Sequence, residues 1–390
     1  MKMNIWSDCK KLPLTEVLSF IVDNRGKTVP TTTSGHILIA TNCIKNDRLY
    51  PCYEKIRFLS EDTYQSFFRS HPIPGDILFV CKGTPGRCAL VPDPIDFCIA
   101  QDMVGLRTNK SIIDNKYLLA VLRSYEIQKF IYNTSVGDVI PHFKKQFFNK
   151  LLIPVPPMEL QTKIGAFYYS ISQKIENKNK INANLEAQAE ALFKSWFVDF
   201  TPFKDQPFVD SELGSIPQGW KVGKLGDICT FKRGKNLLSK NAIDEGVPVV
   251  AGGLAPSCYH NQANTSAPVV TVSGSGANAG FMRMYHVDVW ASDCSFIDVS
   301  CDYLYFVYCF LSVNRRLLKH AQTGAVQPHV KPADIHDFDV VIPEEDIVKA
   351  FQSIIKELLT KVGVNEKENQ RLAALRDTLL PKLMSGEIKL

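Results

Sequence analysis

Two matching loops hold the histidines in this sequence that could do chemistry. Residues 137–144 read GDVIPHFK, and residues 324–331 read GAVQPHVK, 187 positions further along. A histidine in such a loop, His142 or His329, could act as a general acid or base. However, no paired carboxylate or cysteine recurs beside both histidines. We therefore expect a structural or base-contacting role for them, and no catalytic residue in this chain.

The matched aspartates Asp102 and Asp293 lie in a second pair of similar segments, 100–102 and 291–293. A metal site would need further clustered ligands near them, and the sequence offers none. We expect both aspartates to be turn or strand-end residues, and we expect no metal site.

Basic side chains gather around glycines in both halves of the chain. Lysine and arginine contact phosphates, whereas base reading needs side chains on elements that enter a groove. The candidate DNA-binding residues are Arg25, Lys27, Lys82, Arg87, His142, Lys144 and Lys145 in the first half, and Arg233, Lys235, Ser275, Asn278, Arg283, Gln327, His329 and Lys331 in the second. The alternative is that these are surface side chains that only interact with water.

The charge balance differs between the two halves. Residues 1–156 hold 20 Lys and Arg against 14 Asp and Glu, whereas residues 201–343 hold 12 against 13. If both halves bind DNA, the second must do so through local clustering of its basic residues.

Signatures of DNA-modifying catalysis are missing from the sequence. The glycine-rich segment 274–280 does not have the G-x-G-x-x-G or G-x-x-x-x-G-K-[ST] spacing of nucleotide-binding loops. No Asn/Asp-Pro-Pro-Tyr/Phe run of an amino-methyltransferase and no helicase or recognisable nuclease signature occurs. Any such chemistry would have to come from partner proteins.

The loops belong to a longer internal repeat. The segment 25–27 (RGK) recurs at 233–235 and Ile153-Pro154 recurs as Ile342-Pro343, in the same order as the loops. Repeats of this kind decide the architecture of a chain. Short β-type runs broken by Gly, Pro and Asn indicate an α+β fold in both halves.

Two long helices are predicted after the two globular parts. Apolar residues alternate at steps of four and three, which is typical of a coiled-coil seam, and a helix over 158–196 would be roughly 55–60 Å long. The residues expected to pair are Ile164, Ile171, Ile175, Asn182, Leu185, Leu192 and Trp196 with Phe351, Leu358, Val362, Asn369, Leu372, Leu379 and Leu383. We expect antiparallel pairing, with the polar pair Asn182 and Asn369 fixing the register; the alternative is two unrelated surface helices. Pro381 predicts a kink or an early end of the second helix.

We therefore expect an α+β protein with a pseudo-two-fold internal repeat, in which two globular domains are separated by two long helices that pair as an antiparallel coiled coil. The domain boundaries are 1–155 for the first globular domain and 156–200 for the first helix. Residues 201–343 hold a linker and the second globular domain, and 344–390 the second helix. No run of 18 apolar residues or secretory signal is visible, and none of the 11 cysteines sits in a C-x-x-C pair. These features favour a cytoplasmic protein without a membrane segment.

The sequence resembles the specificity subunit of type I restriction-modification systems. Segments that carry the resemblance are 74–78 (PGDIL), 153–161 (IPVPPMELQ), 192–200 (LFKSWFVDF), 212–220 (ELGSIPQGW) and the tail 372–387. The second copy departs from the pattern, because residues 342–346 read IPEED without a double proline. This departure leaves the start of the second helix open.

The resemblance implies two target-recognition domains, each reading one half of a bipartite sequence in double-stranded DNA. It also implies a helical spacer that docks methyltransferase subunits, two in number, and restriction/translocase subunits joined through the complex. A spacer of ~50 Å corresponds to about 15 base pairs of DNA. The chain itself would be non-catalytic and bind no cofactor, with S-adenosylmethionine, Mg and ATP on the partner subunits. The alternatives are the recognition subunit of a system that cuts on both sides of its site, a nuclease or methyltransferase with an unrecognised site, and a coiled-coil assembly protein that binds no DNA.

Overall fold

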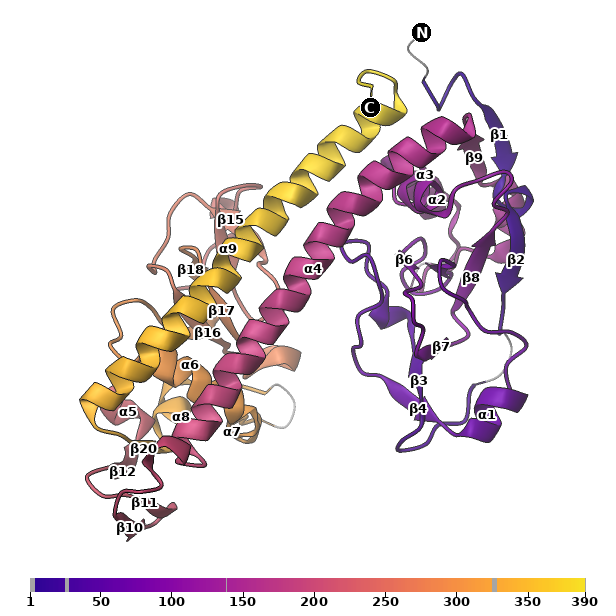
Figure 1. Ribbon diagram of the computed structural model, residues 1–390. Coiled ribbons are helices and arrows are strands. Elements are labelled where there is room, and N and C mark those ends of the chain that lie inside the picture. Colours follow the sequence, from indigo (N-terminus) through magenta and orange to yellow (C-terminus); the bar gives the residue numbers. More distant parts are fainter. Residues whose placement is uncertain (1–3, 25–27, 138, 325–327, 390) are drawn as a thin grey trace. The chain divides into compact units, whose positions relative to one another are not determined.

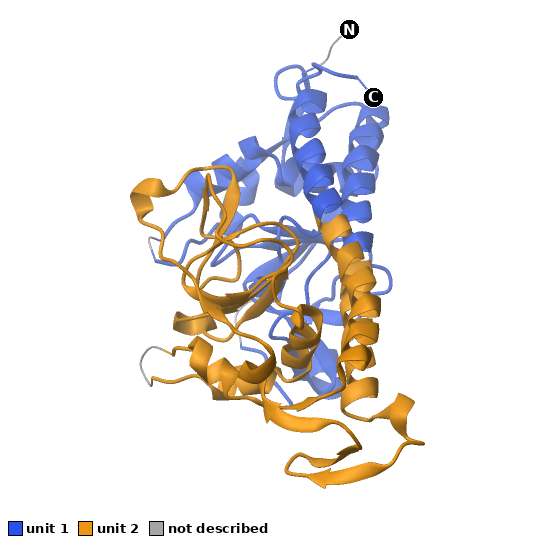
Figure 2. Cartoon of the chain, turned by 90° about the vertical axis from the view of Figure 1, so that its left-hand side faces the viewer, with its two compact units in different colours: residues 1–179, 367–390 blue, residues 180–366 orange. Residues whose placement is uncertain are grey.

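The structure is a computed structural model that describes residues 4–24, 28–137, 139–324 and 328–389. The chain forms two compact units (Figure 2). Unit 1 consists of Met1–Asn179 and Lys367–Leu390, and unit 2 of Lys180–Glu366. Both long helices, α4 (Met158–Phe197) and α9 (Glu345–Met384), contribute one half to each unit.

The described residues of unit 1 form three sheets and three short α-helices (Figure 1). The sheets are β1 (Lys10–Pro13) with β9 (Leu152–Val155); β2 (Leu18–Val22), β8 (Met103–Thr108), β5 (Ile77–Val80) and β6 (Cys88–Leu90), in that order; and β4 (Arg57–Leu59), β3 (His36–Ile39) and β7 (Phe97–Ile99). The helices are α1 (Glu61–Ser66), α2 (Asn115–Leu122) and α3 (Tyr125–Thr134). Asp114 caps α2, because its carboxylate accepts a hydrogen bond from the Tyr117 N–H at 2.9 Å.

Unit 2 repeats this topology strand by strand. Its sheets are β12 (Lys221–Lys224) with β20 (Asp339–Ile342); β13 (Lys232–Arg233), β19 (Cys294–Ile297), β16 (Val269–Ser273) and β17 (Met282–Tyr285), in that order; and β15 (Cys258–His260), β14 (Val247–Val250) and β18 (Trp290–Ala291). Its helices are α5 (Leu225–Ile228), α6 (Leu304–Val313), α7 (Arg315–His320) and α8 (Pro332–His336), and a hairpin of β10 (Phe208–Ser211) and β11 (Gly214–Pro217) precedes β12. In both units the central strand of the three-stranded sheet pairs antiparallel with one neighbour and parallel with the other. The internal repeat and the α+β class predicted from the sequence are therefore confirmed.

The core of unit 1 is built around α2. Residues 117–122 are all buried, and Tyr117, Phe79 and Phe143 are completely inaccessible to solvent. Helix α4 packs close to the start of α2, where a Cβ on Gly165 would lie 2.7 Å from the Tyr117 nitrogen. Glycine at position 165 therefore permits the close approach of the two helices.

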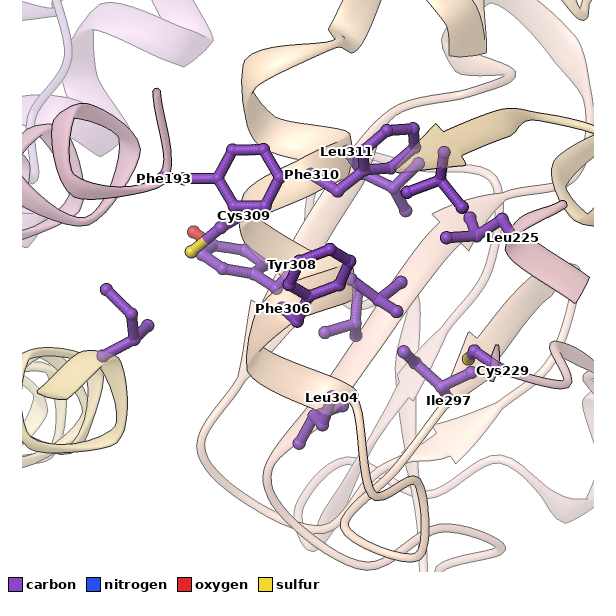
Figure 3. Packing of buried hydrophobic residues seen from close by; sticks show 14 of the residues in the cluster. Phe193, Leu225, Cys229, Ile297, Leu304, Phe306, Tyr308, Cys309, Phe310 and Leu311 are labelled. Atoms are coloured by element: carbon purple, nitrogen blue, oxygen red, sulfur yellow. The ribbon is translucent and has the colours of Figure 1, made fainter. Parts of the chain in front are cut away.

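The core of unit 2 is an aromatic cluster around α6. Figure 3 shows Phe193 of α4 pointing toward Phe306 and Phe310 of α6, with ring centroids 5.4 and 6.3 Å apart. Phe351 of α9 lies against Phe197 at 4.8 Å, in an edge-to-face arrangement. Because α6 is enclosed by this cluster, eight of its ten residues are buried.

The two long helices pair antiparallel within each unit. In unit 2, the Asn365 amide donates to the Asn182 side-chain oxygen at 2.8 Å. In unit 1, Asn369 donates to Asn179 at 2.9 Å, and the Arg376 guanidinium donates to the Ser172 hydroxyl at 3.4 Å. Higher numbers on α4 thus meet lower numbers on α9, as predicted. However, Asn182 and Asn369 do not bond to each other, contrary to the prediction. Asn182 pairs with Asn365 and Asn369 pairs with Asn179, so each actual partner lies about one helical turn from the predicted one.

The positions predicted for helix pairing are all buried or half-buried. Near the C-terminal end of α4, the predicted positions are not the most buried ones. Phe193 and Phe197 are 2% and 6% exposed there, whereas the predicted Leu192 and Trp196 are half-buried. The reason is that this end of α4 faces the aromatic cluster of unit 2 as well as α9.

The structure shows where α9 begins and ends, which the sequence left open. The helix begins at Glu345 without a double proline, and the Glu344 carbonyl accepts hydrogen bonds from the Ile347 and Val348 amides. The helix continues through Pro381 to Met384, so the predicted early end is wrong.

Candidate nucleic-acid interface

Unit 1 brings the two basic loop segments of the sequence together. Lys82 and His142 face each other as an isolated antiparallel bridge. The Gly83 N–H donates to the Pro141 carbonyl at 2.9 Å, and the Phe143 N–H donates to the Cys81 carbonyl at 2.8 Å. We call residues 81–87 with 136–137 and 139–144 the loop pair of unit 1.

Unit 2 contains the same arrangement. Ser275 and His329 form the bridge, the Gly276 N–H donates to the Pro328 carbonyl at 3.1 Å, and the Val330 N–H donates to the Gly274 carbonyl at 3.1 Å. Residues 274–280 with 323–324 and 328–331 are the loop pair of unit 2. The same backbone hydrogen bonds thus hold the histidine loop in both repeats.

A groove of about 990 Å³ lies beside the loop pair of unit 1. It is lined by Asn46, Gly83, Thr84, Pro85, Arg87, Tyr125, Gln128, Lys129, Tyr132, Asn133, Ser135, Gly137 and Pro141. Arg87 and Lys129 are the cations among these described lining residues, and none of them carries a carboxylate. We call this cavity the α3 groove, because five of its lining residues come from α3.

The predicted basic residues of unit 1 differ in how they are held. Lys82 and Lys144 are exposed, whereas Lys145 is half-buried in an ion pair with Asp23. Burial, together with the nearby charges of Lys82 and Lys144, holds the pKa of His142 below its usual value. His142 is therefore a neutral ring at pH 7, suited to hydrogen bonding rather than to charge pairing. The predicted residues Arg25 and Lys27 lie outside the described residues.

In unit 2 the structure gathers four of the predicted residues. Arg233, His329 and Lys331 line a cavity of about 360 Å³, next to Ser275 of the loop pair. The Arg233 guanidinium donates to the Asp293 carboxylate at 2.5 Å, and the Ser275 hydroxyl bonds to the same carboxylate. Asp293 thus orients two candidate contact residues, which is a structural role.

Three other predicted residues of unit 2 do not line this cavity. Arg283, on β17, forms an ion pair with Glu366 of α9 at 3.5 Å and lies over the Tyr285 ring. The Asn278 amide donates to the Gly252 carbonyl at 3.3 Å, and Lys235 is exposed next to β13. Because Arg283 is turned toward α9, it does not join the loop pair. The predicted residue Gln327 lies outside the described residues.

The sequence reasoning missed the α3 side chains of the groove. It assigned no role to Tyr125, Lys129, Tyr132 or Asn133. The available signal was a helical spacing of tyrosine, lysine and amide side chains opposite the buried Ile127 and Ile131.

Two further observations concern metals and membranes. No group of three or more His, Cys, Asp or Glu side chains that could hold a metal ion occurs in the described parts of the chain. Among the residues that the structure describes, no helix is both long and apolar enough to cross a bilayer.

The fold and the two loop pairs are those of a repeated recognition protein with two α+β domains on a helix pair. Residues 29–187 and 217–376 each match the family model described as the type I restriction modification DNA specificity domain. The two matches cover most of the chain, which therefore belongs to this family of type I restriction-modification specificity proteins.

Individual relatives agree with this assignment. The chain is 28% identical over 339 residues to the type I restriction enzyme MjaIX specificity subunit of Methanocaldococcus jannaschii, covering 81% of this chain and 78% of the relative. It is 23% identical over 401 residues to the HindI specificity subunit of Haemophilus influenzae, covering 80% and 86%. The crystal structure of the type I restriction-modification S subunit from M. genitalium has the same fold, with a TM-score of 0.57, 17% identity and 98% of both chains covered. The resemblance stated from the sequence is thus confirmed.

Proposed function

We propose that this chain is the DNA-recognition subunit of a type I restriction-modification complex, in which units 1 and 2 each read one half of a bipartite target. The observation that carries the proposal is the repeated loop pair. The same backbone hydrogen bonds hold a histidine and exposed basic residues in both units. Family membership supplies the type of complex.

The two units offer DNA different balances of charge. Residues 1–156 have a surplus of basic side chains, 20 against 14, so unit 1 attracts the phosphate backbone over a wide surface. Unit 2 has no such surplus and presents Arg233, His329 and Lys331 together around one cavity. In both units the lysine and arginine side chains would position the domain. Polar side chains of the loop pairs, and in unit 1 also those of the α3 groove, would read base edges.

The chemistry of methylation and cleavage would come from partner subunits. The sequence has no amino-methyltransferase or nucleotide-binding signature, so we assign S-adenosylmethionine, Mg and ATP to the partners. We further propose that α4 and α9 dock two methyltransferase subunits, through which restriction/translocase subunits join. The complex would act on DNA in the cytoplasm, and this chain would contribute no catalytic residue.

The test is methylome sequencing of cells that express this chain together with its neighbouring methyltransferase. We expect a bipartite methylated motif, and no methylation by the purified chain alone. Replacing residues 1–155 with those of a relative should change one half of the motif and leave the other half intact. A continuous motif, or a change in both halves after the exchange, would contradict the two-reader model.

A further inference from the structure

Helix α3 of unit 1 presents an unusual stripe of side chains to solvent. Residues 125, 128, 129, 132 and 133 follow the i, i+3, i+4, i+7, i+8 spacing of one helix face, and all five line the α3 groove. The opposite face buries Ile127 and Ile131 in the core. Tyr125 and Tyr132 are 71% and 82% exposed. Exposed rings grouped on one face are typical of binding surfaces, because isolated folding gains nothing from them.

One member of the stripe fixes the helix and leaves the others available. The Gln128 amide donates to the Gly86 carbonyl at 2.9 Å and to the Leu122 carbonyl at 2.6 Å, so α3 is tied to the loop pair. In the described part of the chain, no hydrogen-bond partner is seen for the Tyr132 hydroxyl or the Asn133 amide. These two exposed groups therefore lie on a positioned helix and are accessible to a ligand.

The surroundings of the stripe favour nucleic acid as the occupant. Arg87 and Lys129 line the same groove, no described lining residue is acidic, and Lys82 and Lys144 extend the positive charge along the loop pair. Helix α3 has 10 residues and is roughly 15 Å long, and the major groove of B-DNA is about 12 Å wide and accepts a helix.

We propose that α3 is the base-reading element of unit 1 and that Asn133 and Tyr132 determine its base preference. This inference rests on the proposed function and adds the specificity-determining residues. An asparagine amide pairs with the N6 and N7 edge of adenine through two hydrogen bonds, and an apolar ring face suits the methyl group of thymine. The half-site of unit 1 therefore contains an A·T pair that is read from α3.

The corresponding helix of unit 2 has a different character. Helix α7 reads RRLLKH, with no tyrosine, asparagine or glutamine, and Arg315 bonds to Glu190 at 3.1 Å. It contributes no residue to the cavity lined by Arg233, Gly274, His329, Lys331 and Pro332. We assign phosphate contact to the exposed Lys319 of α7 and base reading in unit 2 to the loop pair. Lys319 thus provides a matched control.

The experiment uses the full chain in complex with its methyltransferase, and it compares methylome motifs and binding to oligonucleotides of the wild-type target. The variants are Asn133→Ala and Tyr132→Ala, with Glu126→Gln on the same helix but off the stripe, and Lys319→Ala in unit 2, as controls. We expect Asn133→Ala to lower the preference at one position of one half-site by about 5- to 150-fold, with the other half unchanged. Tyr132→Ala should relax a neighbouring position. Glu126→Gln should preserve the motif. Lys319→Ala should weaken DNA binding without changing the motif.

Two results would overturn the assignment of α3. One is an unchanged motif in both stripe variants. The other is loss of the methyltransferase from the purified complex, which would identify the stripe as a protein-docking surface. Absence of any bipartite motif for the wild-type complex would instead refute the proposed function, so the two failures are distinguishable. Because Tyr132 and Asn133 are exposed, their truncation leaves the core intact.

Discussion

The buried asparagine pair of unit 2 gives the sharpest test of the helix pairing. Asn365 and Asn182 are 2% and 8% exposed, and the Asn365 amide donates to the Asn182 oxygen at 2.8 Å. The Asn182 amide in turn donates to the Val362 carbonyl at 3.3 Å. In Asn365→Leu, the Asn182 oxygen keeps its buried position but loses its donor. A buried polar group left without a partner costs about 1–3 kcal/mol.

The double variant Asn182→Leu/Asn365→Leu should behave differently. Two leucines continue the apolar seam and remove both members of the polar pair, and such replacements are often neutral or stabilising. The two substitutions should therefore be strongly non-additive, with the double variant at least about 1 kcal/mol more stable than the sum of the single effects. The exposed Val364→Ala, next to Asn365 on α9, is the control and should have little effect.

Hydrogen exchange measured by mass spectrometry is the suitable assay, because it reports local opening in a chain with two compact units. Peptides that cover residues 178–190 and 358–370 should exchange about 5- to 150-fold faster in Asn365→Leu, which is the loss of about 1–3 kcal/mol expressed as a rate. The double variant should return close to the wild-type rate. Unchanged exchange in Asn365→Leu, or strictly additive effects, would refute the reasoning from the buried pair.

The remaining predictions concern charge, packing and pH. Lys144→Ala should reduce the slope of the logarithm of the DNA-binding constant against the logarithm of the salt concentration by up to about one unit. Lys145→Ala should reduce it by less, because Lys145 is ion-paired with Asp23. DNA titrations at several salt concentrations measure both slopes. Phe351→Ala should destabilise unit 2 by about 3–5 kcal/mol in chemical denaturation, whereas Ile354→Ala, 41% exposed on the same helix, should cost far less. Burial lowers the pKa of His286 to about 4, so the unfolded chain binds a proton that the folded chain does not, and unit 2 should lose stability as the pH falls from about 6.5 toward 4. His286→Gln should flatten this part of the profile, and an unchanged profile would show that other groups control it.

The long-range architecture could be read from the sequence because repetition and periodicity are local signals. The loops 137–144 and 324–331 have the same spacing, and the structure gives them the same backbone hydrogen bonds. The seam on α4 and α9 follows from the alternation of apolar residues, and its antiparallel direction follows from the globular segment between the helices. The asparagine partners could not be predicted, because a shift of one helical turn leaves the apolar pattern almost unchanged.

The candidate site was less accessible to sequence reasoning. Counting basic residues treated Lys144, Lys145 and Arg283 alike. The structure separates them, because Lys145 pairs with Asp23 and Arg283 with Glu366. Such pairings depend on residues more than 80 positions away, and one sequence does not reveal them. The α3 stripe was overlooked for a different reason, since the candidate residues were taken from basic clusters and repeated loops, and α3 belongs to neither.

The division of both long helices between the units determines the order in which the protein can be completed on the ribosome. Unit 2 is a continuous segment, 180–366, whereas unit 1 needs residues 367–390 to fill its core with Leu380 and Met384. The Ile5 amide even donates to the Met384 carbonyl at 2.8 Å. Unit 1, whose larger segment is synthesised before unit 2, is therefore closed after it, and it must keep an incomplete apolar surface until residues 367–390 have been synthesised.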